Sequence, residues 1–176
     1  MVLSVMMLFS CENSISKIRE ITLQEDTLAA ISTYDMIYDR SDSGHVQVKL
    51  VSKLMLRFGG NDSYSEFPEG FEITFFDKSG QETSFITANY GITYDKRKFM
   101  SARDNVIIKN FDTNEELYTE NLIWDQKKKI IRSNTFVKLV KPDKTIFGDS
   151  MWANEAFSKY EIYNMKGEFE VEEKDD

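Results

Sequence analysis

The stretch TENLIWDQKKKIIRSNTFVKL at residues 119–139 repeats, with changes, the stretch TANYGITYDKRKFMSARDNVII at residues 87–108. Each copy contains, in order, a Thr-x-Asn motif, an aromatic residue followed by Asp, a run of three basic residues, and two apolar residues two positions apart. Equivalent words lie 32, 30 and 31 positions apart, so the register holds to within one residue. A repeat of this period predicts a supersecondary unit that stacks on its own copy and buries its apolar face there.

The segments around the repeat are short and alternate polar with apolar residues, as in His45–Leu50 and Phe71–Phe76. The chain is rich in Phe and Tyr, which favour pleated sheets, and its 176 residues suit one domain. We therefore expect an all-β fold of antiparallel strands, built from repeats of about thirty residues. A β-sandwich, an open, twisted β-jelly roll and a β-solenoid all fit this pattern.

The charge balance argues against nucleic acid as a partner. The net charge is −8, and the basic runs are short and offset by an acidic tail. Nucleic-acid binding requires a basic stripe that releases counterions from phosphates.

The N-terminus resembles a processed leader. Residues 1–10 are strongly apolar but too short to cross a bilayer core of about 30 Å as a helix. They could form the apolar part of a signal sequence, and Leu8-Phe9-Ser10-Cys11 resembles a bacterial lipobox, in which the cysteine is lipidated. The alternative is a buried first strand with a free cysteine. We divide the chain into a lipobox-like segment (1–11), a polar linker (12–35), a β-jelly-roll domain (36–171) and an acidic tail (172–176).

No catalytic, metal or cofactor site is expected. His45 is the only histidine, and no metal-binding or phosphate-cradling motif is present in the sequence. Asp95 and Asp125 could suggest the paired carboxylates of a glycoside hydrolase. Their equivalent places in the repeat favour a plainer role, in which each Asp opens a tight turn and bonds nearby backbone N–H groups.

The tribasic runs at residues 96–98 and 127–129 follow these aspartates. They are interpreted as solvated hairpin tips. The alternative is a contact with the phosphates of a lipid headgroup.

Strand periodicity also selects candidate interior residues, because alternate side chains share one face of a sheet. Either simple core packing or an apolar groove would use them. The candidates are Leu54, Leu56, Phe58, Ile73, Phe75, Tyr94, Val106, Ile108, Trp124 and Val137.

Several short motifs occur in an order and spacing that, taken together, are fairly specific for one protein family. They are Phe67-Pro68-Glu69-Gly70 before Phe71-Glu72-Ile73, the stretches 104–110 and 117–125, Ile146-Phe147-Gly148, and Met165-Lys166-Gly167-Glu168-Phe169. Over roughly residues 41–171 the chain thereby resembles the LptC family of lipopolysaccharide export and its OstA-like β-jelly-roll relatives. The Phe-Pro-Glu-Gly word and the lipobox-like start are similar to the Bacteroidetes lipoprotein branch.

The resemblance implies a non-enzymatic periplasmic protein anchored to the membrane, by a lipidated Cys11 in place of the family's usual transmembrane helix. It implies that lipopolysaccharide is accepted from an inner-membrane ABC transporter and passed to the next, LptA-like β-jelly-roll protein. The interior candidates would then line a lipid groove, and the strand around Tyr160–Val171 would be the outgoing edge. The alternative is a structural or adaptor lipoprotein that binds protein partners through its sheet edges and has no lipid groove.

Overall fold

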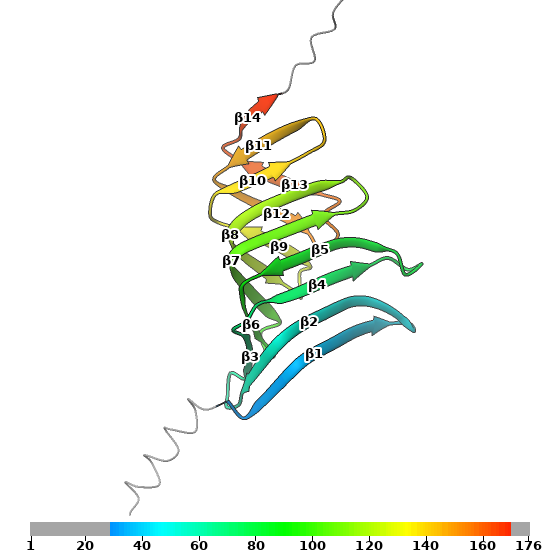
Figure 1. Ribbon diagram of the computed structural model, residues 1–176, viewed down its shortest axis with the longest axis vertical. Helices are drawn as coiled ribbons and strands as arrows, with labels where there is room; N and C mark the ends of the chain where they lie inside the picture. The colour runs from blue at the N-terminus through cyan, green and yellow to red at the C-terminus, as the bar shows by residue number, and fades with distance from the viewer. Residues whose placement is uncertain (1–28, 170–176) are drawn as a thin grey trace, which may run out of the picture.

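The computed structural model describes residues 29–169, which form fourteen β-strands and no helix in that range (Figure 1). The predicted all-β class is confirmed. The strands are β1 (Ile31–Asp42), β2 (His45–Phe58), β3 (Tyr64–Phe67), β4 (Phe71–Phe76), β5 (Glu82–Ala88), β6 (Tyr90–Tyr94), β7 (Phe99–Asn110), β8 (Glu115–Asp125), β9 (Ile130–Ser133), β10 (Val137–Val140), β11 (Lys144–Gly148), β12 (Ser150–Asn154), β13 (Tyr160–Tyr163) and β14 (Lys166–Phe169).

The strands form two facing layers, and every neighbouring pair is antiparallel. The first layer has the order β1-β2-β4-β5-β7-β8-β10-β11-β14. The second has the order β1-β2-β3-β6-β7-β8-β9-β12-β13. The long strands β1, β2, β7 and β8 belong to both layers, so the layers are one folded sheet, as expected for an open jelly roll. Figure 1 shows the strands stacked from β1 at one end to β14 at the other.

The layers meet at corners where the backbone bends sharply. In β7 the pairing register shifts between Arg103 and Val106, and the two residues between them, Asp104 and Asn105, have φ of 65° and 56°. Asp and Asn tolerate this left-handed region better than most residues. At the corner between β3 and β4, Gly70 has a φ of 82°, and a Cβ atom there would lie 2.5 Å from the carbonyl oxygen of Ala88.

The chain forms four V-shaped units, which we call V-hairpins. Each runs through the first layer, rounds a corner into the second layer, turns at the open side of the V and returns. The four are β2–β3–β4 with a turn at 59–63, β5–β6–β7 with a turn at 95–98, β8–β9–β10 with a turn at 126–129, and β11–β12–β13–β14 with a turn at 155–159. The sequence repeat covers the second and third units, so the structure extends it in both directions.

The open-side turns share a backbone feature that the sequence repeat only partly signals. Lys98, Lys129 and Phe157 have φ of 54°, 56° and 51° in three successive units. Asp125 has its predicted turn role, because its Oδ1 accepts a hydrogen bond from the Lys128 N–H at 3.0 Å. Asp95 differs, because its carboxylate bonds to other side chains, as described below.

The core lies between the layers. The ring of Phe75 on β4 meets the ring of Trp124 on β8 edge-on, with 5.4 Å between centroids, and this contact joins the first layer to the second. β1 starts at Ile31, five residues before the predicted start of the domain at 36. Cys11 and the acidic tail at 172–176 lie outside the described residues.

Candidate functional site

A continuous row of apolar side chains runs along the inner wall of the first layer. Its members are direct cross-strand partners, so each strand adds one residue to the row. The row is Tyr38, Leu50, Ile73, Ile86, Ile108, Leu117, Leu139 and Ile146, from β1 to β11. The members from Ile73 to Leu139 are at most 4% exposed. The row therefore gives the interior an apolar track that runs across the strands and along the stack.

The facing wall in the second layer has a matching row that changes character along its length. It begins with Arg57, Ser65 and Thr93 at the β1 end and continues with Met100, Trp124, Ile131 and Ala153. Gly91 lies beside this row, where a Cβ atom would fall 2.5 Å from the Phe71 ring. The polar and small residues leave more room between the layers at the β1 end than at the β14 end.

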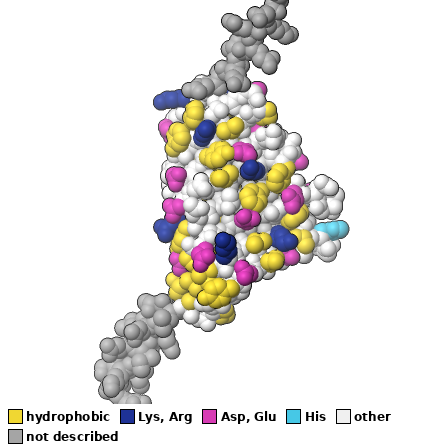
Figure 2. Space-filling model, in the orientation of Figure 1, with side chains coloured by type: hydrophobic (Ala, Val, Ile, Leu, Met, Phe, Trp, Pro, Cys, Tyr) yellow, Lys and Arg dark blue, Asp and Glu magenta, His cyan; other side chains and the backbone are white. Residues whose placement is uncertain are grey.

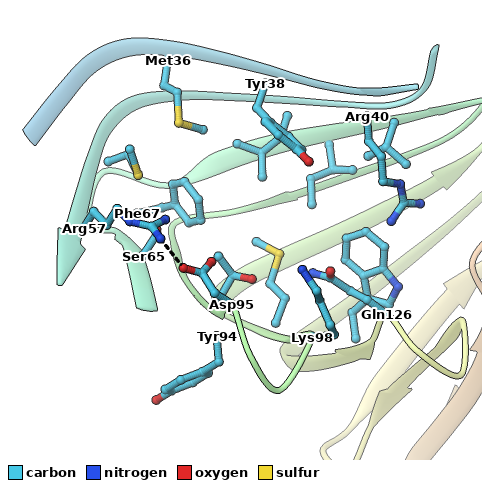
Figure 3. Close-up of a pocket in the computed structure, with 17 residues that line it drawn as sticks. Met36, Tyr38, Arg40, Arg57, Ser65, Phe67, Tyr94, Asp95, Lys98 and Gln126 are labelled. Atoms are coloured by element: carbon cyan, nitrogen blue, oxygen red, sulfur yellow. Dashed lines mark hydrogen bonds and ion pairs between the residues drawn. The ribbon is translucent and has the colours of Figure 1, made fainter. Parts of the chain in front are cut away.

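A cavity of about 300 Å³ occupies this roomier end (Figure 3). Its apolar lining includes Met36, Met55, Phe67, Met100 and Trp124, from strands of both layers. Methionine is unbranched and polarisable, and it adapts to irregular apolar ligands better than branched side chains do. The cavity is thus suited to a flexible apolar group.

Charged side chains stand at the mouth of the cavity. Figure 3 shows Arg57 directed toward Asp95, and Lys98 at the other end of the same turn, 95–98. Asp95 Oδ2 accepts hydrogen bonds from Arg57 Nη2 at 2.5 Å and from Ser63 Oγ at 3.3 Å. Arg40 also lines the cavity, and its Nη2 lies 4.0 Å from Glu155 Oε1. A group with an apolar body and an anionic head would match this arrangement of apolar interior and partly cationic rim.

Midway along the stack, at β7, β8 and β10, the same interior space is filled. Only about 10 Å³ remains between Ile108, Leu117 and Leu139 of the first layer and Phe157 and Tyr160, which enter from the second. That volume is about the minimum needed for one water molecule. The groove is therefore open at the β1 end and closed midway along the stack, and beyond this closed part a hollow of about 330 Å³ lies against Ile146, Tyr160 and Ile162.

The ten residues predicted to be interior divide into two sets. Six are buried on the inner walls: Ile73, Phe75, Val106, Ile108, Trp124 and Val137. The other four are half-buried on the outer face of the second layer: Leu54, Leu56, Phe58 and Tyr94.

The outer placement of Leu54, Leu56 and Phe58 has a local cause. In β2 the buried side chains are Val48, Leu50 and Ser52, and strict alternation would continue them with Leu54. The corner after Ser52 changes the phase, so that Met55 and Arg57 line the cavity and Leu56 pairs with the outward Glu66. The odd-numbered residues past the corner were not predicted to be interior.

Other cavity residues were also not predicted. Phe67 was used only as part of the Phe-Pro-Glu-Gly motif of the family resemblance, and Met100 was not among the interior candidates. Their signal in the sequence is their place two residues from a further apolar or small residue on the same face, as with Met100 and Ala102, both nearly fully buried.

An outer row of four aromatic residues lies on the second layer, and one of them, Tyr94, also borders the cavity. Phe58 pairs with Tyr64, Tyr64 with Tyr94, and Tyr94 with Phe99, so the four rings form a ladder across neighbouring strands. The ring centroids of consecutive members are 4.6, 5.8 and 6.0 Å apart. Figure 3 shows the Tyr94 ring directed away from the other lining side chains.

Beside this ladder, burial and a hydrogen bond to Glu66 raise the pKa of Tyr90 to about 12, so its hydroxyl stays protonated and donates to Glu66 Oε1 at 2.6 Å. The guanidinium of Arg103 stacks over the Tyr90 ring at 4.0 Å. These contacts stabilise the outer face and leave the interior to apolar groups.

The residues that the structure describes include no helix with the length and apolarity that a membrane crossing requires. Comparison with curated proteins finds none that matches this chain. Residues 1–170 match the family described as Lipopolysaccharide-assembly, LptC-related. This family acts in lipopolysaccharide transport in the periplasm and is not a family of enzymes. With its two-layered β-jelly roll and its apolar interior track, the chain belongs to the LptC-related family of lipopolysaccharide-assembly proteins.

Proposed function

We propose that this protein is a lipid carrier that accepts lipopolysaccharide from an inner-membrane ABC transporter and passes it to the next β-jelly-roll protein. The apolar row from Tyr38 to Ile146 is the observation that supports the proposal most directly. Acyl chains lying along it would stay out of water while they slide, and burial contributes about 0.8 kcal/mol per CH₂ group. The energy for transport would come from the ATPase of the transporter.

The sheet edges suit contacts with neighbouring proteins in such a pathway. β1 is the edge strand of both layers at one end, and Ile31, Tyr34 and Ile37 on it are more than half exposed. Figure 2 shows hydrophobic side chains gathered at this end of the stack. At the other end the predicted edge is split, because Asn164, with a φ of 53°, separates β13 in the second layer from β14 in the first. Unpaired strand edges recruit strands from partners.

We also propose that a lipid on Cys11 anchors the protein to the membrane, most simply the inner membrane, where the transporter lies. A lipidated Cys11 would be joined to β1 by residues 12–30, which would act as a tether. Labelling with a fatty-acid analogue should modify the native protein and not a Cys11→Ser variant. Equal labelling of both proteins would contradict the anchor.

Crosslinking tests the carrier function. A photo-crosslinking amino acid at Met36 or Met55, both in the cavity, should capture lipopolysaccharide in membranes with an active transporter. The same amino acid at Glu72, which is exposed on the outer side of β4, serves as the matched control and should capture little. Failure of both cavity positions to capture lipid would contradict a carrier.

The filled middle of the groove favours a second candidate, an adaptor that only joins its protein partners. A Met100→Trp substitution distinguishes the two, because it would fill much of the cavity without touching either sheet edge. A carrier would lose lipid capture and export, whereas an adaptor would keep export unchanged.

A further inference from the structure

The open-side turn of the fourth V-hairpin, residues 155–159, folds inward where the preceding turns project into solvent. We call this turn the latch. Lys98 and Lys129 occupy the positive-φ position of the second and third units and are exposed. Phe157 occupies that position in the fourth unit and is only 5% exposed. A bulky residue is disfavoured at positive φ, so its burial compensates for a strained backbone.

The latch is bonded across the open side to the first layer. Ser84 Oγ donates to the Glu155 carbonyl oxygen at 3.4 Å, and Asn110 Nδ2 donates to the Phe157 carbonyl oxygen at 3.3 Å. Ser84 and Asn110 continue an inner row that starts with the apolar pair Val48 and Phe75. Buried polar groups are costly unless they are hydrogen-bonded. The row therefore changes from apolar to polar residues at the two positions that donate hydrogen bonds to the latch.

The Glu155 side chain of the latch contacts two residues of the cavity wall. Glu155 Oε1 accepts a hydrogen bond from Trp124 Nε1 at 2.8 Å and lies 4.0 Å from Arg40 Nη2. Trp124 and Arg40 both line the cavity, so Glu155 stands at its inner boundary. Beyond this boundary Phe157 covers the apolar row at Ile108, Leu117 and Leu139.

We propose that the latch is a gate between the open cavity and the closed half of the groove, and that a long acyl chain reaches the closed half only when the latch lifts. The proposal rests on the proposed carrier function. A chain that displaced Phe157 would cover the same apolar row, so apolar burial would be exchanged rather than lost. The contacts that would break are the hydrogen bonds from Ser84, Asn110 and Trp124 and one partly exposed ion pair, each of modest strength.

Crosslinking from both sides of the latch tests the gate. Met55 lies in the cavity, and Leu117 lies on the apolar row under Phe157. A Phe157→Gly substitution removes the covering ring and relieves the positive φ. Lipopolysaccharide capture at Met55 should stay unchanged, whereas capture at Leu117 should rise about fivefold or more, the change expected when opening becomes easier by about 1 kcal/mol. The matched control is Lys129→Gly, at the equivalent position of the exposed turn, and it should change neither.

The outcomes separate the gate from the carrier. Capture at Met55 with equal capture at Leu117 in the native protein and in Phe157→Gly would overturn the gate and leave the carrier intact. No capture at Met55 in any variant would overturn the carrier and the gate with it. Should Phe157→Gly fail to fold, Ser84→Ala removes one bond of the latch with a minimal change in volume, and the same rise at Leu117 is expected.

Hydrogen exchange gives an independent readout on the native protein. Hexadecyl maltoside should accelerate exchange of the amides at residues 155–159, whereas octyl maltoside, whose chain is half as long, should leave them protected. Slower exchange of the latch with the long-chain detergent, or no difference between the two detergents, would overturn the gate.

Discussion

Tyr94 and Trp124 hold equivalent places in the sequence repeat, yet their rings lie on opposite faces of the second layer. Trp124 is 3% exposed and faces Phe75 of the first layer, whereas Tyr94 stacks between Tyr64 and Phe99 on the outer side. The inner neighbour of Trp124 across β7 is Thr93, one residue earlier in the repeat. A shift of one residue moves a side chain to the other face of a sheet, so two similar words place their aromatic residues differently.

This difference predicts unequal costs for the same truncation. Trp124→Ala should reduce the free energy of unfolding by about 3–5 kcal/mol, because it empties a buried site and leaves Glu155 without its N–H donor. Tyr94→Ala should cost only about 1 kcal/mol, the scale of aromatic pairing on a half-buried face. Urea denaturation followed by circular dichroism measures both, and equal losses would contradict the opposite placement.

The tight corner at Gly70 predicts that alanine substitution is more destabilising there than at Gly80. Gly70→Ala combines a φ of 82° with a Cβ position 2.5 Å from a backbone oxygen, so it should cost roughly 3 kcal/mol or more. Gly80 has a φ of 86° but open space around its Cβ position, so Gly80→Ala should cost only about 1–2 kcal/mol. Chemical denaturation of the two variants checks the order, and a smaller loss for Gly70→Ala would be inconsistent with the tight corner.

Acid should remove a stabilising contribution of Glu116. Hydrogen bonds from Lys109 and from the Tyr118 hydroxyl lower the pKa of its carboxyl below 4.5. A lowered pKa in the folded state stabilises the protein at pH values above 4.5, and this stabilisation is lost as the pH falls through the lowered pKa. Glu116→Gln should therefore lower the melting temperature at neutral pH by roughly 1–3 °C, a small effect because the pair is partly exposed.

The difference in melting temperature between Glu116→Gln and the native protein should become smaller in acid. Glu72→Gln is the control, since Glu72 is exposed on the outer side of β4 and forms no ion pair among the described residues. Thermal melts across a pH series would refute the assignment if the gap between Glu116→Gln and the native protein stayed constant in acid.

The ion pair at the cavity mouth should be weak and sensitive to salt. Arg57 and Asp95 have side chains that are 41% and 34% exposed. A double-mutant cycle with Arg57→Met, which keeps an apolar stem, and Asp95→Asn should give a coupling of about 0.5–1 kcal/mol. The coupling should fall as ionic strength rises. A coupling free energy that does not fall in high salt would contradict this, because it would mean that the Arg57–Asp95 pair is less accessible to solvent than the exposure of its side chains indicates.

Local strand patterns were predictable from the sequence where both faces have a clear environment. Phe71–Phe76 has the predicted bounds, because turn residues flank it. β1 was not placed at Ile31, because an edge strand exposes both faces and its burial does not alternate. β3 was missed because it consists of only four residues that run into the Pro-Glu-Gly corner.

The candidate site was only partly predictable, because corners and long-range contacts decide it. The phase change after Ser52 cannot be read from a period of two, and it exchanges Leu54 and Leu56 for Met55 and Arg57 in the interior. The sequence repeat did not reveal the fourth unit, because the turn of that unit lacks the run of three basic residues. The burial of Phe157 depends on Ser84 and Asn110, which lie more than forty residues earlier in the chain.

The way the inner rows are built gives the protein a modular length. Each V-hairpin adds about two strands to each layer, and neighbouring strands lie about 4.8 Å apart, so one unit extends the stack by roughly 10 Å. The inner rows continue in register from one unit to the next, because every unit contributes residues at the same row positions. Gaining or losing one unit would change the distance that the protein spans in steps of fixed size, without any redesign of the walls. A homologue with one more repeat would thus have a longer stack of the same two layers.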